Sequence, residues 1–148
     1  MIIIAADPGN MTGWASVSLG EHWDPAEVAA GQLPADEFCD WIATVGSHVD
    51  LYLFETFTIN NNTQRKSPQP IALETIGVMK FIARRAGVNI IGQSPASAKQ
   101  FVNDAQLRKI GLWQPGKDHA RDAIRHLVLG IVSQTTGQAQ QELLQSLA

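Results

Sequence analysis

The sequence predicts an α/β fold in which helices cover a mixed sheet. Three runs typical of strands come first, and helical and strand-like segments alternate after them. The 148 residues suit one domain, and 45% hydrophobic with 17% charged residues is enough apolar material for a core. We therefore expect a single domain over residues 1–148.

The first part of the chain predicts a three-stranded meander followed by a helix. Residues 2–6 are an apolar run that ends at Asp7-Pro8-Gly9, as expected of a buried strand before a turn. Residues 12–19 alternate and predict a second strand, antiparallel to the first, with a loop at 8–11. Residues 27–33 predict a weaker third strand. Pro34 then begins a helix with one apolar stripe, made of Phe38, Trp41, Ile42 and Val45.

Beyond this helix the pattern alternates. Residues 49–54 predict a fourth strand, and the polar stretch 56–70 is the one long loop. A helix over 71–86 ends at Gly87 and leads to a fifth strand over 88–92. Because helical crossovers join strands one, four and five, these strands should run parallel.

The last third of the chain predicts helices only. A helix over 95–110, a loop over 111–116 and a long helix over 118–133 follow one another. The tail, 137–148, is interpreted either as a short helix or as a frayed end.

Charge is distributed unevenly along the chain. The formal net charge is −3, but residues 1–64 hold nine acids and no Lys or Arg, whereas residues 65–148 hold all eleven basic residues and five acids. Such a chain can present a basic face to phosphates, although an ordinary mixed surface explains the composition equally well.

Several classes of protein are disfavoured. The single cysteine, Cys39, allows neither an internal disulfide nor a zinc site of several thiolates. The opening apolar run is too short for a signal sequence or a membrane span. We expect a cytoplasmic protein with no membrane partner and no small-molecule cofactor.

Two predicted strands end in a carboxylate. Asp7 follows the first strand and Glu55 the fourth. Ligand sites in α/β sheets gather at such ends, and burying an unpaired carboxylate is costly. For either acid alone, capping of the next turn is an equally good explanation; the occurrence of both favours a site.

The segment KDHARDA, at 117–123, adds a third element at the start of the last helix. His119 and Asp122 are three residues apart and share a helix face. With the two strand-end acids they would form an oxygen-rich set with one imidazole, which suits Mg²⁺ or Mn²⁺ better than structural zinc. Asp118 is either a further ligand or, more often, an N-cap. His126 near the same face is interpreted as a supporting or packing histidine.

These residues carry a resemblance. ADPGNMTGWASV at 6–17, FE at 54–55 and DHARDA at 118–123 resemble the RuvC family of Holliday junction resolvases, and the compact size resembles its bacteriophage-type members. The resemblance implies a ribonuclease H-like fold: a five-stranded mixed sheet of order 3-2-1-4-5, flanked by helices.

The resemblance also implies an activity, the cleavage of branched DNA by two divalent ions, Mg²⁺ or Mn²⁺, which hold the scissile phosphate. It makes Asp7, Glu55, His119 and Asp122 the metal-binding catalytic residues. Asp7 would bridge both ions, and His119 would bind a metal or orient the water. The segment SPASAKQFV, at 94–102, resembles the family's segment with a catalytic basic residue and matches Lys99 to it. A solvated helix lysine is the equal alternative.

Phosphate contacts should supply most of the affinity for DNA. The predicted DNA-binding residues are Arg65, Lys66, Phe57, Lys99, Arg108 and Lys109. Phe57 would stack or wedge at an open junction centre, or it packs its own loop down.

Three other functions compete with this one. A ribonuclease H-like nuclease of the pre-ribosomal-RNA processing type usually has Lys-Arg in the first hairpin, where this chain has Asn10-Met11. A non-catalytic junction-binding module is disfavoured because every matched acid is intact. An actin-like phosphotransferase fold needs a second domain that 148 residues do not supply.

A homodimer is also expected, because a four-way junction must be cut at two symmetric strands and the chain carries one candidate site. The predicted interface lies on the helix over 71–86, along a stripe of residues at helical spacing: Ile71, Glu74, Val78, Ile82 and Arg85.

Overall fold

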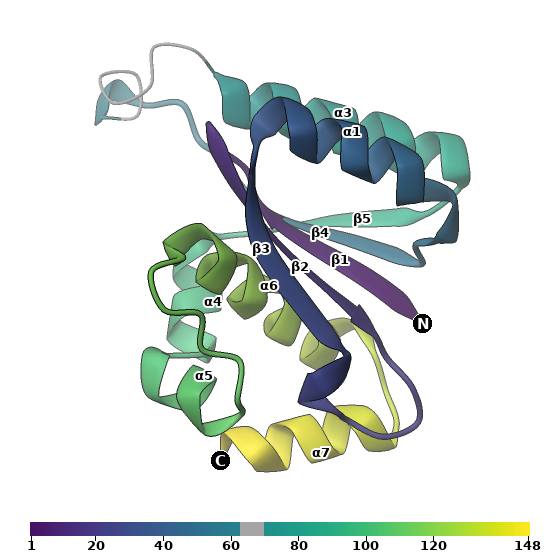
Figure 1. Ribbon diagram of the computed structural model, residues 1–148, viewed down its shortest axis with the longest axis vertical. Coiled ribbons are helices and arrows are strands. Elements are labelled where there is room, and N and C mark those ends of the chain that lie inside the picture. The colour runs from purple at the N-terminus through teal and green to yellow at the C-terminus, as the bar shows by residue number, and fades with distance from the viewer. Residues whose placement is uncertain (63–69) are drawn as a thin grey trace.

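The computed structural model describes residues 1–62 and 70–148, and these contain a five-stranded sheet of order β3-β2-β1-β4-β5 (Figure 1). Its strands are β1 (Ile2–Asp7), β2 (Met11–Ser18), β3 (Val28–Pro34), β4 (Leu51–Glu55) and β5 (Asn89–Gln93). Strands β1, β2 and β3 pair antiparallel, whereas β4 runs parallel to both β1 and β5. The predicted strand order and directions are confirmed.

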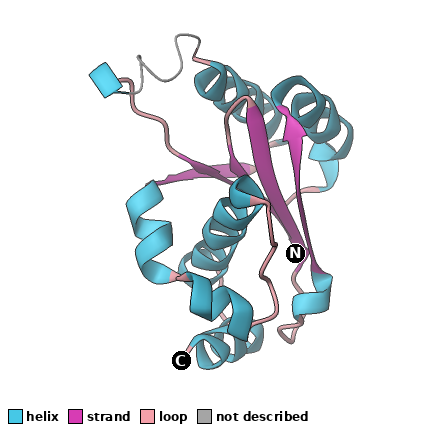
Figure 2. Cartoon of the chain, turned by 60° about the vertical axis from the view of Figure 1, so that its left-hand side comes forward, coloured by secondary structure: helices cyan, strands magenta, loops and turns pink. Residues whose placement is uncertain are grey.

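Helices cover both faces of this sheet (Figures 1 and 2). One face carries α1 (Ala35–Val45) and α3 (Ile71–Ala86). The other carries the long helix α6 (Asp118–Gln134), with α4 (Pro95–Phe101), α5 (Asp104–Lys109) and α7 (Gln138–Leu147) beside it. Two single-turn 3-10 helices, Pro25–Glu27 and Gly46–His48, lie in the connections before β3 and β4.

Strand pleating divides the core into two clusters. Ile3, Ala5, Leu51 and Leu53 face α6 and form the α6-side cluster with its apolar residues. The residues between them face the opposite way, toward α1 and α3, and form the α1/α3-side cluster with apolar residues of these helices. They are Ile4, Ala6, Tyr52 and Phe54. This period of two decides which helix layer meets the residue that ends each strand.

Two glycines, one on the sheet and one on the helix, let α6 lie directly against the strands. A Cβ atom on Gly13 of β2 would lie 1.9 Å from the carbonyl oxygen of His119. A Cβ atom on Gly130 of α6 would lie 2.1 Å from a methyl carbon of Leu53. The absence of these two side chains lets the start and the middle of the helix rest directly on the strands.

The predicted helix over 95–110 is wrong, because the chain breaks after Phe101 into α4 and α5. Val102 is extended, with φ −131° and ψ 108°. The side chain of Asn103 accepts from the backbone N–H of Gln106, whose own side chain accepts from the N–H of Asn103. This capping box starts a new helix and outweighs the helical periodicity on either side of it.

The tail over 137–148 forms a packed helix rather than a frayed end. Leu143 and Leu147 of α7 are buried in the α6-side cluster. In the middle of the same helix, Glu142 accepts from the backbone N–H of Trp23 and pairs with His22. Helix α7 therefore packs on the α6-side cluster and is tied to the connection between β2 and β3.

Helix α3 uses part of its predicted interface stripe inside the chain. Val78 and Ile82 are partly buried against the α1/α3-side cluster. Leu73 and Phe81 point outward instead and are 36% and 54% exposed. Among the described residues, no helix is long and apolar enough to cross a membrane.

Candidate functional site

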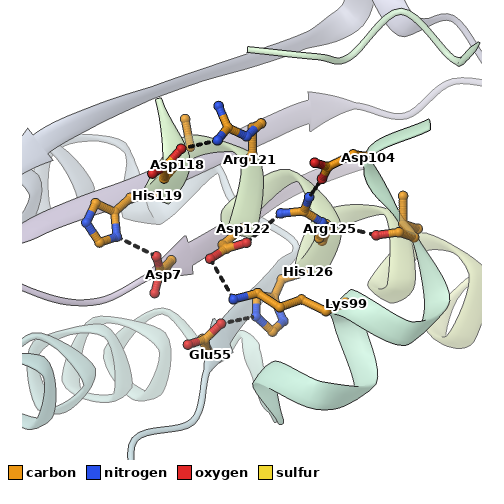
Figure 3. Close-up of polar contacts among 12 residues, drawn as sticks. Asp7, Glu55, Lys99, Asp104, Asp118, His119, Arg121, Asp122, Arg125 and His126 are labelled. Atoms are coloured by element: carbon orange, nitrogen blue, oxygen red, sulfur yellow. Dashed lines mark hydrogen bonds and ion pairs between the residues drawn. The ribbon is translucent and has the colours of Figure 1, made fainter. Parts of the chain in front are cut away.

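The two strand-end acids meet on the α6 face of the sheet. Strands β1 and β4 are in parallel register with Ala6 opposite Phe54, so the next pair along is Asp7 and Glu55. Since Ala5 and Leu53 face α6, the alternation turns Asp7 and Glu55 the same way. Figure 3 shows both carboxylates beside the first turns of α6. The predicted grouping of these acids with the last helix is present in the structure.

Asp7 is buried, with 8% of its surface exposed, and its Oδ2 lies 2.8 Å from Nδ1 of His119. Burial raises the pKa of Asp7 from 3.8 to about 6, and the nearby charges of Glu55 and Asp122 add to this effect. The hydrogen bond and charge of His119 act in the opposite direction. The ionised form of this carboxyl is therefore disfavoured, chiefly because burial removes it from water.

Glu55 is held by a buried histidine. Nε2 of His126 lies 2.9 Å from Oε2 of Glu55, and Nδ1 lies 2.8 Å from Oε1 of Gln93. The side chain of His126 is almost completely buried. Because Gln93 ends β5 and Glu55 ends β4, this ring fixes the ends of two neighbouring strands to α6.

Asp122 lies between two cations (Figure 3). Its Oδ2 is 3.2 Å from Nζ of Lys99, and its Oδ1 accepts from Nη1 of Arg125 at 2.5 Å. Arg125 is buried and also donates to Asp104 and, from Nε, to the carbonyl oxygen of Val102 at 3.1 Å. The carbonyl freed by the break between α4 and α5 is thus bonded to the arginine that orients Asp122.

The start of α6 is capped from the sheet and not by Asp118. The side-chain oxygen of Gln32 in β3 accepts from the backbone N–H groups of His119 and Ala120, at 3.0 and 3.3 Å. Asp118 is the first helical residue and pairs with Arg121, with 80% of its side chain exposed. The N-cap role expected for Asp118 is therefore wrong, since Gln32 satisfies those donors.

A cavity of about 780 Å³ opens beside Asp122. Three cations and three acids line it together with Asn103 and Ala105, and they are Lys99, Arg121, Arg125, Asp104, Asp118 and Asp122. Because these charges are equal in number and paired, the cavity is polar without being strongly charged.

The residues predicted to bind DNA lie in different places. Lys99 contacts Asp122, and Arg108 and Lys109 are exposed at the end of α5. Phe57 is partly buried against the α1/α3-side cluster, which is the packing alternative that the sequence left open. Arg65 and Lys66 fall outside the described residues.

Sequence reasoning missed the residues that orient the acids. Gln32, Gln93 and Arg125 come from three separate elements, and their roles depend on tertiary contacts. One signal was available: Arg121 and Arg125 each follow an aspartate by three residues, a spacing that places both members of a pair on one helix face.

The donor set fits a divalent metal by type and by charge. Three carboxylates and one imidazole gather at one edge of the sheet, and oxygen ligands with an imidazole suit Mg²⁺ or Mn²⁺. As the side chains lie, each acid is turned toward its protein partner. No three Asp, Glu, His or Cys side chains in the described ranges come close enough together to hold one ion.

Comparisons with known proteins bear on the fold. No protein-family model matches the chain, and its sequence matches no curated protein. Among solved structures, it is similar to Thermus thermophilus RuvC in complex with a Holliday junction substrate, with a TM-score of 0.55, 16% identity and coverage of 85% of this chain and 89% of that one. A second structure of RuvC from Thermus thermophilus gives a TM-score of 0.52 at 19% identity, covering 85% and 90% of the two chains. The chain has a RuvC-like, ribonuclease H-like fold.

Proposed function

We propose that this protein is a metal-dependent endonuclease that resolves four-way DNA junctions by paired, symmetric nicks. The observation that carries the proposal is the convergence of Asp7, Glu55, Asp122 and His119 at one edge of a RuvC-like fold. One of the similar structures holds a Holliday junction, which supports branched DNA as the substrate class.

Asp7, Glu55, Asp122 and His119 are the residues that would hold Mg²⁺ or Mn²⁺, two ions per site. The bound ions would supply Lewis-acid stabilisation of the phosphate's charge and make water a better nucleophile at neutral pH. Before that, each ligand is kept in place by a protein partner: His119 for Asp7, His126 for Glu55, and Lys99 with Arg125 for Asp122. These partners limit the separation of acids that would otherwise repel one another.

Lys99 is the residue best placed to act on the phosphate itself. Its ammonium lies 3.2 Å from Oδ2 of Asp122 and lines the cavity next to it. One of its three donors faces Asp122, which leaves others for a phosphate oxygen of a strand in that cavity. Its role would be to bind and orient the scissile group while charge builds on its oxygens.

A second copy of the chain would supply the second cut. Leu73 and Phe81 lie two helical turns apart on the outward face of α3, and Gly77 lies between them. The apolar area there fits a two-fold contact between copies, in which each α3 packs on the other.

A cleavage assay tests the proposal. A labelled four-way junction, a DNA duplex, a DNA single strand and an RNA hairpin would be incubated with Mg²⁺, Mn²⁺ or EDTA. Symmetric nicks in the junction alone, absent in EDTA, are expected. Cleavage of the RNA hairpin in preference to the junction would favour an RNA-processing nuclease, and tight junction binding without cleavage would favour a binding module.

Matched variants test whether the activity depends on this site. Asp7→Asn should abolish nicking while junction binding survives, whereas Glu37→Gln, which removes an exposed acid on the opposite helix layer, should cut as the unmodified protein does. Nicking by Asp7→Asn at the unmodified rate would overturn the site assignment.

A further inference from the structure

The last turn of α5 presents an arginine that lies over the ring of a tryptophan in the segment joining α5 to α6. Its guanidinium carbon lies 3.7 Å from the ring centroid of Trp113. This residue, Arg108, is exposed at the end of α5, and no carboxylate in residues 1–62 or 70–148 forms an ion pair with it. Stacking on an aromatic face restrains the guanidinium plane but uses none of its N–H donors.

A second arginine lies over the ring of Trp113. The guanidinium carbon of Arg121 lies 4.4 Å from the same ring centroid. Arg121 donates to the carbonyl oxygen of Gln114 at 2.7 Å and pairs with Asp118. Because Arg121 lines the cavity beside Asp122, Trp113 connects that cavity to Arg108.

The ring is held in place from below. Ile110 and Leu112 are buried in the α6-side cluster on either side of Gly111, and Trp113 packs partly against the same cluster. The N–H of Leu112 donates to the carbonyl oxygen of Leu107 at 2.9 Å, and Gly111 adopts a left-handed φ of 76°. Trp113 is therefore held by a packed segment, and Arg108 by the last turn of α5, so neither side chain is presented by a free loop.

We propose that Arg108, held over the ring of Trp113, binds a backbone phosphate of the DNA strand that enters the cavity beside Asp122. A planar guanidinium with unused donors matches two oxygens of a phosphate, which is the geometry that a flexible lysine does not provide. Arg121, with its charge already paired to Asp118, braces the ring from the cavity side. The inference rests on the proposed DNA-binding function and adds to it a specific phosphate contact.

Junction binding in EDTA tests this, with a labelled four-way DNA junction as the probe and dissociation constants measured across a range of salt concentrations. Arg108→Ala should weaken binding about three- to ten-fold and lower the slope of log Kd against log salt by about 1, the effect of one lost phosphate contact. Asn89→Asp makes the same change in net charge at the first residue of β5, which lies at the end of the strands opposite to Asp7 and Glu55. This variant should bind as the unmodified protein does.

Two further variants separate a held guanidinium from mere positive charge. Arg108→Lys keeps the charge and loses the stacked plane, so its binding should stay at least two-fold weaker than that of the unmodified protein. Trp113→Leu removes no charge, yet it should weaken binding in the same way as Arg108→Ala. Circular dichroism tests whether each variant is folded. If Trp113→Leu unfolds, Trp113→Phe takes its place. Because Trp113→Phe keeps an aromatic face, it should bind the junction nearly as tightly as the unmodified protein does.

The outcomes distinguish this inference from the proposed function. If the unmodified protein fails to bind the junction, the proposed function falls. If it binds, but Arg108→Ala binds equally well or Arg108→Lys restores full affinity, only the stacked phosphate contact is overturned.

Discussion

Asp7 is kept in the fold at an electrostatic cost. Its raised pKa, about 6 against 3.8, means that the folded state disfavours the ionised carboxylate. Protonation of Asp7 therefore stabilises the folded state. This stabilisation is fully present below about pH 4 and is lost as the pH rises through about 6. The same negative charge would attract a divalent cation at the proposed metal site.

Asp7→Asn should therefore stabilise the metal-free protein. At pH 8 in EDTA, we expect the free energy of unfolding to rise by about 1 to 3 kcal/mol, since two pKa units correspond to at most about 3 kcal/mol. The gain should shrink as the pH falls toward 4. Urea unfolding at several pH values measures this; a variant less stable than the unmodified protein at pH 8 would show that Asp7 contributes favourable contacts instead.

Asp122 should respond in the opposite way. It pairs with Lys99 and with the buried Arg125, so Asp122→Asn leaves a buried guanidinium with weaker partners. We expect a loss of about 1 to 3 kcal/mol by urea unfolding in EDTA. Equal stability would mean that Asp104 and the carbonyl oxygen of Val102 satisfy Arg125 by themselves.

His119 should set the metal preference. Imidazole is a softer ligand than carboxylate and is better tolerated by Mn²⁺ than by Mg²⁺. We expect faster junction cleavage with Mn²⁺, and a shift toward Mg²⁺ in His119→Asp, measured as the ratio of the two rates. An unchanged ratio would remove His119 from the ligand set and leave it as the hydrogen-bond partner of Asp7.

At the scale of elements, the position of α6 decides the site, because this helix carries His119, Asp122 and His126. Its start rests on β2, where Gly13 leaves no room for a side chain. The same turn is capped by Gln32 from β3. The distance from His119 to Asp7 therefore depends on contacts of α6 with β2 and β3, two strands that carry no proposed ligand.

Gly13→Ala should displace this helix start. The added methyl would lie 1.9 Å from a backbone oxygen, which a side-chain rotation does not relieve, and overpacking of this kind costs about 1 to 3 kcal/mol. We expect lower thermal stability together with lost cleavage. Gly20→Ala, where a Cβ meets nothing within 4 Å, is the matched control and should change neither property.

The elements differ in how far the sequence predicts them. Strand patterning and the helical crossovers predicted the strands and their directions, and the acids after strands one and four predicted a site at the carboxyl ends of these strands. The strand order that makes these two strands neighbours was implied by the family resemblance and not by the pattern. The break at Val102 has a local signal, the capping box of Asn103 and Gln106, which the helical periodicity on either side concealed. The capping by Gln32 was not predictable in this way, because it depends on the start of α6, which is distant in sequence.

At the scale of the molecule, the two faces of the sheet separate two tasks. The α6 face holds every candidate ligand and the cavity beside Asp122. The α1/α3 face holds no proposed ligand and presents Leu73 and Phe81 to solvent. A partner on α3 would thus leave the candidate site open to DNA.

We predict that the working form is a homodimer in contact through α3. Light scattering at micromolar concentration should give twice the chain mass. Phe81→Ser should shift the protein toward monomer, because it removes the exposed aromatic ring of α3, while Leu144→Ser, a change at an exposed apolar residue on α7, should not. Phe81 is 54% exposed in the single chain, so its loss should cost the monomer little stability.

The dimer also has a consequence for cleavage. Each copy carries one candidate site, so a monomeric variant should nick the two strands of a junction independently instead of in pairs. On a supercoiled cruciform plasmid, Phe81→Ser should accumulate nicked circles where the unmodified protein gives linear product. A Phe81→Ser protein that remains dimeric would place the interface elsewhere, and an unmodified protein that is monomeric and still makes paired cuts at every concentration would refute the two-fold arrangement itself.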